Sequence, residues 1–180
     1  MQKSTEKYRG DCVRIEVLLV ILAIGAGVIE NLIPRPLPFI KLGLANVITV
    51  AAIAKYGFWT GLRVNILRST GAALFIGTLA TPTYLLSVSG GIASAVVMGC
   101  TKKCFSVTGM SVSGSLSSLS IQLLTASALL PGLPTENLVL PLTIWGFLSG
   151  TITGIVATVL LRRGFPWIYN PGVDSACMPE

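Results

Sequence analysis

The residues in this chain most able to do chemistry are a few ionisable side chains placed in long apolar runs. Glu30, Lys41 and Arg68 each lie within or at the edge of such a run. Ionisable groups inside a bilayer are costly and usually functional. Arg68 lies about 16 Å beyond Gly57 at 1.5 Å per helical residue, near the middle of a hydrocarbon core of about 30 Å. We expect the three residues to share one polar layer.

Two interpretations of this layer stay open at the level of the sequence. In the first, Glu30 pairs with Arg68 or Lys41, and the ion pair only fixes how the helices pack. In the second, the surplus positive charge lines a pocket that receives a substrate carboxylate or phosphate. Arg63 takes no part in either, because it lies only about 9 Å into its run and can reach the membrane surface.

A second polar feature is the stripe formed by Ser111, Ser115, Ser118 and Gln122. Its spacings of 4, 3 and 4 place these side chains on one helix face. Serine alone can serve close helix packing in membranes. A buried glutamine amide needs hydrogen-bonding partners, so Gln122 favours ligand binding, and Asn46 forms a similar polar face in an earlier run.

Small residues gather in the first apolar run, where Ala23 and Gly27 are four positions apart. Such a surface lets another helix approach closely. It could therefore serve packing within the chain or docking of a partner subunit.

Several chemistries are excluded by what the chain lacks. It contains no phosphate-binding loop for ATP hydrolysis and no aspartate-rich cluster for magnesium and diphosphate, and its 180 residues include no histidine. We expect no catalytic residue, metal site or cofactor in this chain. Nucleic-acid binding is also excluded, because the basic residues behind the net charge of +6 stand between apolar runs.

The composition predicts the elements that position these residues. The chain is 52% hydrophobic and only 11% charged, which is typical of a membrane protein. We expect an all-α membrane protein with six transmembrane helices between a tail at 1–14 and a tail at 164–180, forming one domain over 15–163. The apolar runs cover about 15–33, 37–56, 58–80, 83–101, 107–130 and 138–161.

The distribution of basic residues predicts the orientation. Ten of the 13 lysine and arginine residues fall on one side, in the N-terminal tail, in two connections and at Arg162–Arg163, and only Arg35 and Lys41 fall on the other. Basic residues favour the cytoplasmic side. We therefore expect a multi-pass protein of the cell (inner or plasma) membrane with both termini inside.

The stretch ENLIPRPLP at residues 30–38, followed by KLGLAN at 41–46, resembles a family signature. The family is that of heptaprenyl diphosphate synthase component I, also called Gx transporters, whose members look like the substrate-binding S components of energy-coupling-factor (ECF) transporters. The resemblance covers about residues 15–163. It implies an S-component-like bundle, a pocket open to the outside, and coupling to a separate transmembrane subunit and ATPases.

The fifth run departs from this family, which has His-Asn-x-Gly-Gln where this chain has Ser118-Leu119-Ser120-Ile121-Gln122. Only the glutamine is kept. If the histidine and asparagine contact substrate in relatives, this chain binds a different ligand or binds it weakly.

The sequence therefore predicts a substrate-binding membrane subunit for uptake of a small solute, with positive charge favouring an anion and partner ATPases supplying energy. A first alternative is a non-catalytic membrane component I of a heptaprenyl diphosphate synthase, working with a soluble partner. A second is a purely structural membrane protein. The residues expected to bind substrate are Glu30, Arg35, Lys41, Asn46, Arg68, Ser118 and Gln122, with Ala23 and Gly27 for partner docking.

Overall fold

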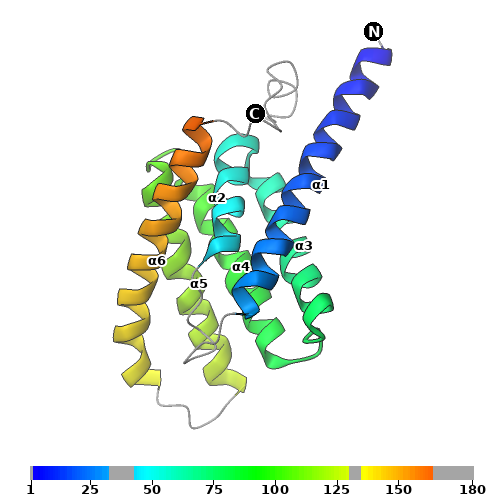
Figure 1. Ribbon diagram of the computed structural model, residues 1–180. Coiled ribbons are helices and arrows are strands. Elements are labelled where there is room, and N and C mark those ends of the chain that lie inside the picture. The colour runs from blue at the N-terminus through cyan, green and yellow to red at the C-terminus, as the bar shows by residue number, and fades with distance from the viewer. Residues whose placement is uncertain (1, 33–42, 130–134, 164–180) are drawn as a thin grey trace.

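A computed structural model describes residues 2–32, 43–129 and 135–163, and these residues form six helices and no strand (Figure 1). Each predicted apolar run contains one helix, which confirms the all-α prediction for these ranges. The helices are α1 (Gln2–Leu32), α2 (Leu44–Tyr56), α3 (Phe58–Ile76), α4 (Pro82–Thr101), α5 (Val107–Leu129) and α6 (Thr135–Arg163).

The first helix is longer than the apolar run that predicted it. The basic start of the chain is helical from Gln2 onward, and this part of α1 projects beyond the other helices (Figure 1). α1 packs mainly against α3 and α2. Its remaining face is lined by exposed apolar residues such as Val17, Ile21 and Ile29.

α2 is the central helix of the bundle and contacts all five others. Most of its side chains are apolar, as expected of a surrounded helix, and its residues 47–53 are all buried. With 13 residues it measures about 20 Å, less than the hydrocarbon thickness of about 30 Å. The described part of the predicted run 37–56 is therefore too short to cross a bilayer, and residues 37–42 lie outside the described ranges.

Glycines let α6 pack closely against α5. A Cβ atom on Gly150 would lie 2.8 Å from Val112 Cα, and one on Gly154 would lie 2.7 Å from Thr108 Cα. Both distances are too short for real atoms, so only glycine fits. With Gly146, these residues form a repeat of small residues at every fourth position, which is typical of close helix contacts in membranes.

Four of the helices are long and apolar enough to cross a membrane, which indicates a membrane protein. They cover Cys12–Glu30, Pro82–Thr101, Val107–Leu129 and Glu136–Arg163. α3 has 19 residues but is more polar, because it contains Arg63, Asn65 and Arg68. Six spans and the orientation stay predictions.

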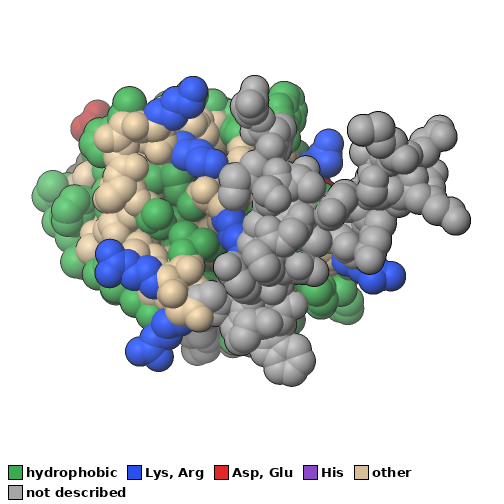
Figure 2. All heavy atoms as spheres, turned by 90° about the horizontal axis from the view of Figure 1, so that it is seen from above, with side chains coloured by type: hydrophobic (Ala, Val, Ile, Leu, Met, Phe, Trp, Pro, Cys, Tyr) green, Lys and Arg blue, Asp and Glu red, His purple; other side chains and the backbone are tan. Residues whose placement is uncertain are grey.

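The exposed basic side chains gather at one end of the bundle. Figure 2 views this end and shows Lys and Arg side chains at several points around it. Four connections or helix ends contribute them, with exposed residues Arg14, Arg63, Lys102, Lys103, Arg162 and Arg163. At the opposite end, the described residues include no lysine or arginine.

Candidate functional site

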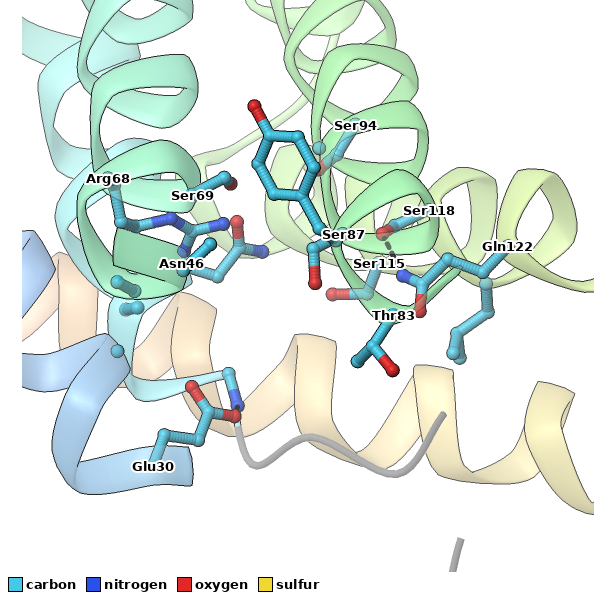
Figure 3. A pocket seen from close by; sticks show the side chains of 18 of the residues that line it. Glu30, Asn46, Arg68, Ser69, Thr83, Ser87, Ser94, Ser115, Ser118 and Gln122 are labelled. Atoms are coloured by element: carbon cyan, nitrogen blue, oxygen red, sulfur yellow. Dashed lines mark hydrogen bonds between the residues drawn. The ribbon is translucent and has the colours of Figure 1, made fainter. Parts of the chain in front are cut away.

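A polar cavity of about 130 Å³ lies inside the bundle, in the half away from the basic end. All six helices line it, so the whole fold is needed to build it. Figure 3 shows its polar side chains pointing toward a common space. Its labelled lining residues are Glu30, Asn46, Arg68, Ser69, Thr83, Ser87, Ser94, Ser115, Ser118 and Gln122.

Arg68 brings a positive charge to the cavity wall. Its side chain is half-buried, and Nη2 donates a hydrogen bond of 2.8 Å to Asn65 Oδ1 one turn earlier in α3. Asn65 is itself only 2% exposed, so this hydrogen bond fixes the guanidinium against a buried residue. The Arg68 side chain reaches toward Asn46 of α2 (Figure 3). Among the described residues, Arg68 is the one lysine or arginine that lines the cavity.

Glu30 is the acidic residue of the wall and is 5% exposed. Its Oε1 accepts a hydrogen bond of 2.6 Å from the backbone N–H of Gly43, directly before α2. Gly43 has φ 79°, a left-handed conformation that favours glycine. A carboxylate at a helix N-terminus is also favoured by the helix dipole. Glu30 therefore ties the end of α1 to the start of α2, besides interacting electrostatically with Arg68.

The predicted stripe on α5 faces the bundle interior. Ser115, Ser118 and Gln122 line the cavity, and Gln122 Nε2 donates to Ser118 Oγ at 2.8 Å. Ser111 lies deeper, where its hydroxyl forms a 2.8 Å hydrogen bond with Thr153 of α6. The stripe thus combines a packing role at Ser111 with a cavity-lining role at the other three residues.

The structure brings together five of the seven predicted binding residues, namely Glu30, Asn46, Arg68, Ser118 and Gln122. Arg35 and Lys41 lie outside the described residues, so their roles stay predictions. α4 also contributes to the cavity, which the sequence-based prediction did not include. Tyr84, Ser87, Gly91 and Ser94, at spacings of 3, 4 and 3, all line the cavity, and this helical periodicity was the signal available.

Ala23 and Gly27 lie inside the bundle. Ala23 is 0% exposed and belongs to a core cluster with Leu19 and Ile48. A Cβ on Gly27 would lie 3.5 Å from Ala72 Cβ of α3. The small-residue surface therefore packs α1 within this chain, and a docking role for these two residues would require the bundle to open.

No group of three or more histidine, cysteine, aspartate or glutamate side chains able to hold a metal occurs in the described part of the chain. What the cavity offers instead is one arginine, one glutamate, two amides and many hydroxyls. These groups can bind and orient a polar molecule.

Comparison with known proteins identifies the family. The family described as heptaprenyl diphosphate synthase component I matches residues 19–160, which include most of the cavity wall and all but the ends of the bundle. No curated protein and no solved structure matches the chain. Because the match covers well over half of the sequence, the chain belongs to the heptaprenyl diphosphate synthase component I family.

Proposed function

We propose that this chain is a non-catalytic membrane subunit that binds a small polar ligand in its cavity. The observation that carries the proposal is a positioned arginine in a polar chamber inside an apolar bundle. Polar groups buried in a membrane bundle are costly, and they usually mark the path or site of a substrate. A cavity of about 150 Å³ holds a molecule the size of benzene, so a chamber of 130 Å³ suits a small solute or the head group of a larger one.

Arg68 sets the proposed chemistry of the ligand. A guanidinium presents several donors in a fixed plane and matches a carboxylate or phosphate. Asn46, Ser118 and Gln122 would add hydrogen bonds from the facing helices, and Glu30 would hold the end of α1 against the start of α2. Arg35 and Lys41, on the predicted outer side, would add to the positive charge.

The family name supports placing this subunit in a heptaprenyl diphosphate synthase assembly, as component I. The catalytic carboxylates would then come from a soluble partner, because this chain has only seven aspartate and glutamate residues and no aspartate-rich motif. The diphosphate of a prenyl chain is an anionic head group of the kind that Arg68 would accept.

A second candidate function is uptake of a small solute by an S-component-like subunit with a transmembrane coupling subunit and ATPases. The position of the cavity favours it, because the cavity lies away from the basic end. If that end is cytoplasmic, as predicted, the cavity faces the outside of the cell. Transport and the ATPase partners rest on the family resemblance.

Purification from native membranes in mild detergent, followed by mass spectrometry of intact complexes, tests these proposals together. A small molecule bound to the chain is expected. A soluble prenyl synthase subunit with aspartate-rich motifs would support the first assembly. A membrane subunit with two ATPases would support uptake. Finding neither a partner nor a bound molecule would overturn the proposal and favour a purely structural membrane protein.

A further inference from the structure

We propose that Gly90 and Gly91 of α4 are positioning residues that hold the polar side chains of the cavity in place. This inference rests on the proposed binding function. α4 packs between α3 and α5. Neither glycine has a side chain of its own, and each leaves room for a buried amide from one of these neighbouring helices.

Gly91 faces Asn65 of α3. A Cβ at position 91 would lie 2.6 Å from Asn65 Nδ2 and 3.2 Å from Asn65 Oδ1. The same Oδ1 accepts the 2.8 Å hydrogen bond from Arg68. The missing side chain at Gly91 therefore leaves the space in which the Asn65 amide lies, and from there Asn65 binds the Arg68 guanidinium.

Gly90 faces α5 in the same way. A Cβ at position 90 would lie 2.6 Å from Gln122 Nε2 and 2.8 Å from Ser118 Oγ. These two atoms are the partners of the hydrogen bond across the α5 side of the cavity. An alanine at position 90 would displace both atoms at once.

Other tightly packed glycines of the bundle differ in what they touch. A Cβ on Gly99, in the same helix, would lie 2.5 Å from Phe58 Cδ2, and one on Gly61 would lie 2.0 Å from Ile53 Cγ1. Those glycines make room for apolar side chains. Gly90 makes room for two polar side chains of the cavity wall, and Gly91 makes room for the Asn65 amide that binds Arg68. An added methyl group is therefore expected to move the amides rather than separate the helices.

The test measures the charge that the cavity presents, and it needs no knowledge of the natural ligand. In the full chain in lipid nanodiscs, Ser87→Cys places a thiol in the cavity wall. Two methanethiosulfonate reagents, one anionic and one cationic, are allowed to react, and mass spectrometry follows labelling at position 87. The Arg68 charge should make the anionic reagent react faster, and Arg68→Gln in the same background should remove that preference.

Gly91→Ala is expected to lower the ratio of anionic to cationic rates several-fold, because Asn65 no longer holds the guanidinium. Gly99→Ala is the matched control: it crowds the same helix against Phe58 and should lower thermal stability without changing the ratio. An unchanged ratio in a folded Gly91→Ala protein would overturn the inference. If Gly91→Ala alone does not fold, adding Asn65→Ala should restore folding and keep the ratio low, and failure of that rescue would also overturn it.

The test separates this inference from the proposed function. If position 87 reacts with neither reagent in the chain that keeps both glycines, the cavity is closed to solutes, and the binding function and the inference resting on it both fail. If position 87 reacts with a preference that depends on Arg68 but not on Gly91, only the positioning role fails.

Discussion

At the scale of single residues, Glu30 shows how a charged group in an apolar helix can have a structural role. Its carboxylate accepts a hydrogen bond from the backbone N–H of Gly43 at the start of α2. Hydrogen bonds to charged groups are stronger than neutral ones, and an unpaired amide in a membrane is costly. The sequence interpretation of Glu30 as a partner for Arg68 or Lys41 did not include this contact, because no spacing along a single helix relates Glu30 to a backbone N–H 13 residues later.

We predict that Glu30→Ala lowers the free energy of unfolding by about 1–3 kcal/mol, because the Gly43 amide loses its acceptor. Glu30→Gln should lose less, since its side-chain oxygen can still accept the bond. Thermal unfolding of the detergent-solubilised protein measures both. Equal losses for the two variants would show that the charge, and not the hydrogen bond, carries the role of Glu30.

Arg68 is predicted to be essential for binding but not for folding. Arg68→Gln should lower the occupancy of a co-purified small molecule in native mass spectrometry. The affinity loss should be on the order of a hundredfold, because removing one partner of a buried charge pair costs about 2–5 kcal/mol. Arg63→Gln is the control in the same helix, since Arg63 is 65% exposed and pairs with Glu16 at 3.6 Å. Retained occupancy with Arg68→Gln would defeat the assignment of the cavity.

Much of the candidate site could be predicted at this scale because charge inside an apolar run is a strong signal. Arg68 stood out for that reason, whereas Asn46, Ser118 and Gln122 stood out as neutral polar residues on one helix face; all four line the cavity. The hydroxyls of α4 were harder to predict, since serine is common in membrane helices as a packing residue. The role of Gly91 depends on a contact with Asn65 that no spacing along the chain reveals.

At the scale of the helices, hydrophobicity located each element but not its ends. α1 extends to Gln2, because a helix pairs its own backbone N–H and C=O groups in water as well as in lipid. α2 begins only at Leu44, after the left-handed Gly43, although the apolar run predicts a start near 37. The small residues Ala23 and Gly27 predicted a close helix contact. The partner turned out to be within the bundle, which the sequence left open.

The glycine repeat on α6 leads to a prediction about helix packing. Gly150→Leu should destabilise the protein by about 1–3 kcal/mol or more, because a side chain there must push away the α5 backbone at Val112. Gly25→Leu on the exposed face of α1 is the control, since nothing lies within 4 Å of a Cβ at that position. Thermal unfolding in detergent measures both. Equal stability of the two variants would contradict the close α5–α6 contact.

At the scale of the whole molecule, the charges and the cavity occupy opposite halves of the bundle. Successive helices run in opposite directions. The connections after α2 and α4 therefore lie at the basic end, together with the N-terminal part of α1 and the end of α6 (Figure 1). The cavity lies nearer the other end, between α1, the start of α2 and the facing helices. The side of the membrane on which the cavity opens, and hence the choice between uptake and a cytoplasmic enzyme assembly, depends on orientation.

We predict that the basic end faces the cytoplasm, and thiol labelling in sealed vesicles tests this. Cys100 and Cys104 are exposed at the basic end, and Asn137→Cys would place a thiol near the start of α6 at the opposite end. A membrane-impermeant maleimide should label position 137 in right-side-out vesicles and Cys100 and Cys104 in inside-out vesicles, with all three labelled after detergent. The reverse pattern would place the cavity toward the cytoplasm. Uptake from outside would then be excluded as the role of the site, and an intracellular prenyl diphosphate would become its natural ligand.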